Sequence, residues 1–131
     1  MRLSSRIGWF VVAGGIGFLV DAGVLSLLVH LGAESRLARL ASFSIALVVT
    51  WLVNRSRTFA DRAGRASLRE FAQYAVASAL AASVNLGVYM VLVTWSDPFR
   101  AHPVLALAVA TAVSMSVNFW SYLKVVFAPK P

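Results

Sequence analysis

Long stretches without a charged residue dominate the chain, and four of them approach or exceed the length needed to cross a bilayer. Residues 71–95 and 103–123 contain no charge, residues 7–31 contain one, and residues 40–54 are uncharged between two arginines. A helix rises about 1.5 Å per residue and the hydrocarbon core is about 30 Å thick, so about 20 apolar residues span it. The pattern predicts one domain over residues 1–131, with transmembrane helices at about 7–31, 38–54, 71–95 and 103–124.

The second of these helices is the shortest. Its 15 uncharged residues would reach only about 22 Å, so Arg39 and Arg55 are expected to extend along the helix toward the lipid head groups. Composition supports a membrane location. With 131 residues, 60% hydrophobic and 13% charged, and a mean hydropathy of +0.78, the chain carries more apolar surface than a soluble core of this size buries. The sequence therefore predicts an all-α integral membrane protein.

Lysine and arginine are distributed unevenly among the predicted loops. Nine belong to the termini and the central loop, namely Arg2, Arg6, Arg55, Arg57, Arg62, Arg65, Arg69, Lys124 and Lys130. Three belong to the other two turns, namely Arg36, Arg39 and Arg100. Because basic loops remain in the cytoplasm, the pattern predicts that both termini are cytoplasmic. This topology and anionic lipid explain the net charge of +7, so we expect no nucleic-acid partner.

The two halves of the chain resemble each other in sequence. A shift of 64 residues aligns Asp21 with Asn85, whereas a shift of 68 aligns Thr50 with Asn118. The two registers differ by about one helical turn, and the pattern alone does not choose between them. The matches favour a tandem repeat of a two-helix hairpin, and the even number of helices makes the two copies parallel in the membrane.

Asp21 is the one charge in the first predicted helix. Gly14, Gly17 and Phe18 precede it on the same helical face, where small residues allow a neighbouring helix to approach closely. An ionised carboxylate left unmatched in hydrocarbon costs about 2.5–3.5 kcal/mol on insertion scales, so Asp21 is expected to face inward. Two interpretations stay open: a contact for substrate or proton, or a hydrogen-bonded residue that only fixes helix register.

Two similar segments end the second and fourth predicted helices. They read TWLVNRSRTF at residues 50–59 and NFWSYLKVVF at residues 118–127. Each runs from a polar side chain through an aromatic to a base and a final phenylalanine. Amides and hydroxyls suit sugar hydroxyls, and a base at head-group depth suits a phosphate. An ordinary interfacial belt of aromatic and basic residues would use the same residue types.

Four segments together resemble the GtrA-like family of small four-helix membrane proteins. They are FVVAGGIGFLVDAGV, NRSRTF, REFAQY and SVNFWSYLKVVF, and they span nearly the whole chain. The resemblance implies a translocase, or flippase, that moves a polyprenyl-phosphate-linked sugar across the bacterial inner membrane for cell-surface polysaccharide assembly. This chain has Thr50 where the family usually has an asparagine, and Arg57 where an aromatic residue is common.

The resemblance gives the polar residues roles. Sugar hydroxyls and phosphate cannot cross hydrocarbon without polar partners. The implied phosphate contacts are Arg6, Arg55, Arg57 and Lys124. The implied sugar contacts are Asp21, Thr50, Asn54, Asn85, Asn118, Trp120 and Tyr122. Four helices enclose little space, so a homodimer or larger assembly is expected, with the Gly14 and Gly17 stripe as a candidate contact between copies.

Two other functions stay open from the residues alone. One is a small proton-coupled multidrug exporter that uses Asp21, although the charge bias argues against the dual insertion common in that group. The other is a non-transporting membrane partner of a glycosyltransferase. An enzyme is not expected, because His30 and His102 lack a carboxylate pair or thiol nearby and the chain has no cysteine. No cofactor or metal is expected either.

Overall fold

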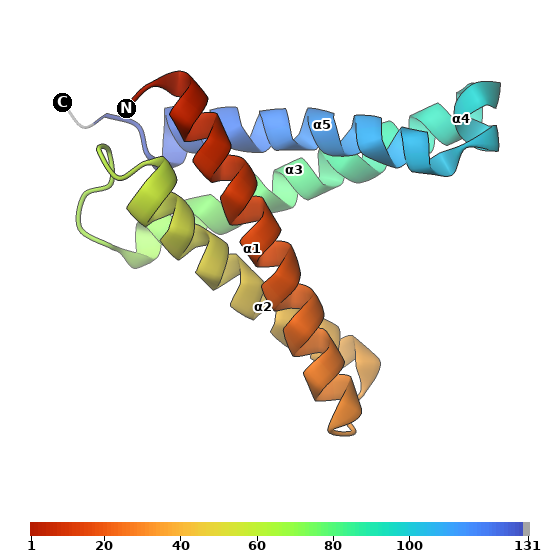
Figure 1. Ribbon diagram of the computed structural model, residues 1–131, viewed down its shortest axis with the longest axis horizontal. Coiled ribbons are helices and arrows are strands. Elements are labelled where there is room, and N and C mark those ends of the chain that lie inside the picture. Colours follow the sequence, from red (N-terminus) through yellow and green to blue (C-terminus); the bar gives the residue numbers. More distant parts are fainter. Residues whose placement is uncertain (130–131) are drawn as a thin grey trace. The chain divides into compact units, whose positions relative to one another are not determined.

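Each half of the chain folds as a helical hairpin (Figure 1). The structure is a computed structural model in which residues 1–129 are described, so Lys130 of the basic set lies outside the described residues. Hairpin 1, within Met1–Arg65, consists of α1 (Leu3–His30), α2 (Ser35–Val53) and the π-helical turn η1 (Asn54–Thr58). Hairpin 2, within Ala66–Pro131, consists of α3 (Leu68–Trp95), α4 (Asp97–Ala101), α5 (Pro103–Ser121) and the π-helical turn η2 (Tyr122–Val126).

Four helical segments are long and apolar enough to cross a membrane. They are Leu3–His30, Ser35–Thr58, Leu68–Trp95 and Pro103–Val126. The predicted all-α fold with four transmembrane helices is therefore confirmed. The expectation of a short second helix was wrong, because that segment has 24 residues. It reaches about 36 Å, enough to span the hydrocarbon core.

Local capping explains why α2 and α3 begin before their apolar stretches do. The Glu34 carboxylate accepts hydrogen bonds from the backbone N–H groups of Arg36 and Leu37 at 3.2 and 3.1 Å, which starts α2. The Ser67 hydroxyl accepts one from the Glu70 N–H at 3.1 Å, which starts α3. The charged residues of these first turns do not enter the hydrocarbon core, because they lie before the apolar stretch of each helix.

Both registers of the internal repeat are present, each in a different helix of the hairpin. On the first helices, buried residues match at 64: Phe10 with Tyr74, Ala13 with Ala77, and Gly17 with Ala81. On the second helices, the π turns match at 68. The Phe59 N–H donates to the Asn54 carbonyl at 2.8 Å, and the Phe127 N–H donates to the Tyr122 carbonyl at 2.7 Å. The extra residues therefore lie between the helices, where hairpin 2 has α4.

Helices α1 and α2 pack closely at a glycine. A Cβ atom at Gly17 would overlap the Cγ2 methyl of Thr50, whereas a Cβ atom at Gly14 would meet nothing within 4 Å. Gly17 therefore serves packing inside hairpin 1. Gly14, the other member of the stripe expected between copies, is exposed.

Gly17→Ala is expected to destabilise hairpin 1 by about 1–3 kcal/mol, because overpacking forces helices or rotamers apart. The Thr50 hydroxyl donates to the Leu47 carbonyl at 3.0 Å, which holds its methyl group in place. Adding Thr50→Ser removes the methyl and should recover most of the loss, measured as the melting temperature in detergent. Gly14→Ala is the matched control, and an equal loss from both alanine substitutions would contradict this packing.

Candidate functional site

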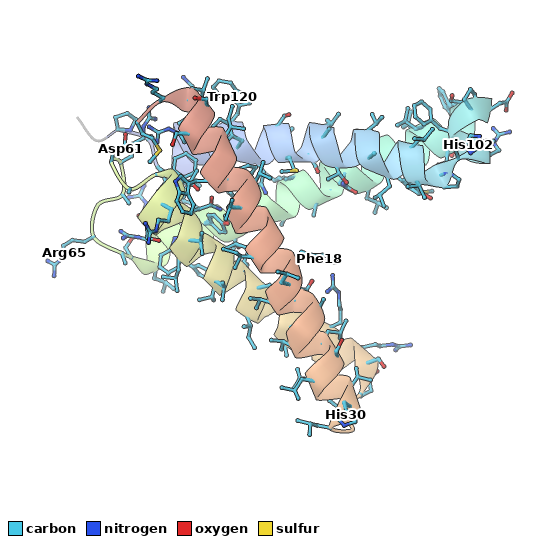
Figure 2. All side chains as sticks on the ribbon, viewed as in Figure 1. Phe18, His30, Asp61, Arg65, His102 and Trp120 are labelled. Carbon is cyan, nitrogen blue, oxygen red and sulfur yellow. The ribbon has the colours of Figure 1, made fainter. Side chains whose placement is uncertain are left out.

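Polar side chains gather at two levels in each hairpin. The rim is the end where the first helix begins and the second ends, and the turn end is opposite. In Figure 2, Asp61 marks the rim of hairpin 1 and His30 its turn end, while His102 marks the turn end of hairpin 2. The inner level lies along the helices between rim and turn. Among the described residues, no group of three or more potential metal ligands gathers at either level.

The rim of hairpin 1 is built around Arg6. Its guanidinium donates to the two carboxylate oxygens of Asp61 at 3.0 and 2.9 Å and to the Thr58 carbonyl at 3.3 Å. Arg6 is only 5% exposed, and its guanidinium carbon lies 5.6 Å from the ring centroid of Phe59. A bidentate charge-assisted pair of this kind is among the stronger polar contacts in proteins. It joins the start of α1 to the turn that follows η1.

The three η1 residues predicted to contact the substrate differ in their surroundings. The Asn54 side chain is buried, and its Oδ1 atom accepts a hydrogen bond from the Thr58 hydroxyl at 2.8 Å. Arg55 donates to the Gly64 carbonyl, and its guanidinium carbon lies 5.9 Å from the ring centroid of Trp51. Arg57 is exposed, with its guanidinium carbon 5.3 Å from the ring centroid of Trp9. Over residues 1–129, no carboxylate or hydrogen-bond acceptor engages Arg57.

The Arg6 guanidinium, through its hydrogen bonds, holds the pKa of Asp61 below its ordinary value. This pair therefore adds stability at neutral pH, and the gain is lost as the pH falls below about 4 and through the lowered pKa. Because the Asp61 side chain is 41% exposed, we expect Asp61→Asn to cost less than about 1 kcal/mol at neutral pH. The melting difference from wild type should shrink toward about pH 3. A difference that stays constant over this range would contradict the ion pair.

The rim of hairpin 2 contains a stacked pair of tyrosines. The rings of Tyr74 and Tyr122 are 4.3 Å apart between centroids and nearly parallel, at 18°. The Tyr122 hydroxyl lies 2.5 Å from the Ser78 hydroxyl. One turn earlier, the Oδ1 atom of Asn118 is buried without a hydrogen-bond partner among the described residues. Trp120 is exposed and meets Phe119 edge-on, and Lys124 is exposed on η2.

The inner cluster of hairpin 1 explains the charge in α1. Asp21 accepts hydrogen bonds from the Ser42 hydroxyl at 2.7 Å and from the Arg39 guanidinium at 2.5 Å. The expectation that Arg39 extends toward the head groups was wrong, because its guanidinium turns to the carboxylate of the neighbouring helix. The carboxylate faces its partner helix, as expected. Its charge is matched within the hairpin.

The inner cluster of hairpin 2 contains no charge. The Asn85 amide nitrogen donates to the Ser114 hydroxyl at 3.2 Å and to the Thr111 hydroxyl at 3.4 Å. Asn85 is the repeat counterpart of Asp21, so the same place holds an ion pair in one hairpin and an amide with hydroxyls in the other. Within hairpin 1, Asp21 lies 15 residues beyond Arg6, about 22 Å along α1, which keeps its inner cluster separate from its rim.

Several partners of the predicted residues were missed from the sequence. They are Arg39, Ser42, Asp61, Tyr74 and Ser78. One signal was available for Arg39, since it is the one cation in residues 37–54 and a carboxylate on the preceding helix needs a cation. The Arg6 and Asp61 pair spans 55 positions and gives no periodic signal.

Comparison with known families agrees with the helical arrangement. A family model described as GtrA/DPMS, transmembrane domain, matches residues 9–127. The match confirms the resemblance inferred from the four sequence segments and covers both hairpins. No curated protein matches the chain significantly. This match fits a membrane protein that takes part in the metabolism of glycans and sugar-linked lipids.

Proposed function

This chain belongs to the GtrA/DPMS transmembrane-domain family, and we propose that it translocates a polyprenyl-phosphate-linked sugar across the bacterial inner membrane for glycan assembly. The supporting observation is that each hairpin carries polar side chains at two depths of an otherwise apolar span. Unpartnered polar groups in hydrocarbon cost several kcal/mol each. Polar side chains at successive depths would lower that cost for sugar hydroxyls.

The phosphate is proposed to bind at the rim, where the positive-inside pattern places the cytoplasmic face. Arg57 on the rim of hairpin 1 and Lys124 on the rim of hairpin 2 are each a candidate, because both are exposed and Arg57 keeps its donors away from any carboxylate within residues 1–129. Arg6 is engaged by Asp61, so we assign it to holding the rim together. Arg55, which donates to Gly64, supports the same loop.

The sugar is proposed to use neutral polar groups. Asn85 and Asn118 are the strongest candidates, since Asn85 belongs to an uncharged inner cluster and Asn118 has a buried carbonyl oxygen without a hydrogen bond among the described residues. Thr50 and Asn54 hydrogen-bond within hairpin 1 and shape it. We further propose that copies of the chain associate in the membrane.

The exporter alternative is less well supported by the geometry. A proton- or drug-binding carboxylate needs an unmatched charge, and Asp21 is matched by Arg39 and Ser42. The remaining alternative is a partner protein that organises a glycosyltransferase without transporting anything.

Vesicles containing only the purified chain separate these functions. Transbilayer movement of a fluorescent polyprenyl-phosphate sugar, absent from protein-free vesicles, would support translocation. Export of a cationic dye driven by a proton gradient would instead support the exporter. A chain that moves neither, yet raises the activity of an added polyprenyl-phosphate glycosyltransferase, would contradict the proposal.

A further inference from the structure

Hairpin 2 is hollowed between its inner cluster and its turn end. A cavity of about 370 Å³, open along the surface of the hairpin, is lined by Asn85, Leu86, Tyr89, Pro103, Val104 and Leu107. A second cavity, of about 470 Å³, shares Pro103 and Val104 with the first and extends to His102. Small-molecule sites have volumes of about 300–1,000 Å³. Space of that order therefore adjoins the inner cluster of hairpin 2 and continues toward the turn.

Two polar groups of the first cavity have no partner. Asn85 uses its amide nitrogen for Thr111 and Ser114, but over residues 1–129 neither its carbonyl oxygen nor the Tyr89 hydroxyl forms a hydrogen bond. Both residues lie in the span Leu68–Trp95, where an unmatched polar group is costly. The remaining lining is apolar. A ligand with both hydroxyl groups and an apolar face satisfies this lining better than a hydrocarbon chain does.

The equivalent residues of hairpin 1 satisfy each other's polar groups. The repeat matches Asn85 with Asp21 at a shift of 64 and Leu107 with Arg39 at a shift of 68. Asp21 and Arg39 form an ion pair, whereas the Leu107 side chain offers Asn85 no hydrogen-bonding group. The duplicated position has therefore diverged into an internally matched ion pair in hairpin 1 and, in hairpin 2, a cluster in which the Asn85 side-chain oxygen has no hydrogen-bond partner among residues 1–129.

We propose that the cavity of hairpin 2 binds the monosaccharide head of the lipid-linked sugar on the turn side of the membrane, in a state in which the phosphate no longer lies at the rim. The side-chain carbonyl of Asn85 accepts a hydrogen bond from one sugar hydroxyl, and the Tyr89 hydroxyl forms a hydrogen bond with another. Leu107 contacts the apolar face of the sugar ring. The inference rests on the proposed function and narrows it to one hairpin. Tyr89 becomes a sugar contact that the sequence did not indicate.

The test measures how much the sugar adds to binding. The full chain in nanodiscs is titrated with bare polyprenyl phosphate and with the same lipid carrying glucose, galactose, mannose or N-acetylglucosamine. Wild type should bind at least one glycosylated lipid about tenfold more tightly than the bare lipid, as one or two hydrogen bonds provide. Tyr89→Phe should reduce the ratio of the two affinities, glycosylated over bare lipid, about three- to tenfold without changing the melting temperature. Ser83→Ala, which removes an exposed hydroxyl of α3 bonded to the Ala79 carbonyl, should leave it unchanged.

Asn85→Leu tests the second contact and should also reduce the ratio. If it lowers stability, because Asn85 joins α3 to α5, the Tyr89→Phe result decides alone. Equal binding of bare and glycosylated lipids by wild type, or an unchanged ratio in Tyr89→Phe, would overturn the sugar site and leave at most a lipid-chain groove. Binding is separate from transport: sugar-dependent affinity without movement in vesicles would overturn the proposed function alone. Movement with an unchanged ratio would overturn this inference alone.

Discussion

Arg39→Leu is expected to destabilise the protein by about 2–3 kcal/mol, because it leaves the Asp21 carboxylate unmatched inside the span. Asp21→Leu should cost less. Arg39 is 54% exposed in its side chain and can turn to the head groups, whereas Asp21 is 19% exposed and cannot. The double leucine variant removes both charges and should recover most of the stability. Melting temperature and membrane abundance of the three variants give the measurement.

The same variants separate structure from function at this site. If Asp21 serves only to match Arg39, the double variant should transport normally as well as fold. Stable double-variant protein without transport would show that the carboxylate also serves substrate or proton. Independent, additive losses from the two single substitutions would contradict the ion pair itself, because partners in contact give coupled effects.

Arg57→Gln is expected to lower the rate of lipid-linked sugar movement about tenfold or more. Hydrogen bonds to a charged group contribute about 1.5–3 kcal/mol, and Arg57 offers the planar guanidinium fork that phosphate oxygens accept. Arg57→Lys keeps the charge and loses the fork, so it should fall between wild type and Arg57→Gln. Vesicle transport at equal protein content gives the measurement.

Arg65→Gln is the matched control for this prediction. It removes one basic charge from the loop after η1, and its side chain points away from the ribbon in Figure 2. General attraction to anionic lipid predicts equal effects of the two substitutions, whereas a phosphate site predicts a loss only at Arg57. Equal transport by both variants would reduce Arg57 to a membrane anchor.

The fold was predictable because its main determinant is local. A charge-free stretch of about 20 residues in lipid must satisfy its backbone within one helix, so run length alone identifies the spans. The helix starts were less accessible, because capping by Glu34 and Ser67 extends helices into polar sequence. The two repeat registers could not be assigned from sequence, since the extra residues lie in the turn that forms α4.

The site was predictable only as a set of polar residue types. The sequence identified Asp21 and Asn85 by their position in apolar helices and paired them through the repeat. Their different surroundings depend on side chains of the following helix, Arg39 in one hairpin and Leu107 in the other. Arg6 was taken as a free base at the rim, and only the three-dimensional fold brings Asp61 to it.

Movement of lipid-linked sugar by the purified chain alone tests the proposed function most directly. Vesicles are prepared with a labelled polyprenyl-phosphate sugar in both leaflets, and membrane-impermeant periodate then oxidises the exposed sugars. Protein-free vesicles should protect the inner-leaflet half of the label. Vesicles holding the wild-type chain should lose that protection, more slowly with Arg57→Gln than with Arg65→Gln. Continued protection of the inner-leaflet label by folded wild-type protein would contradict translocation by this chain.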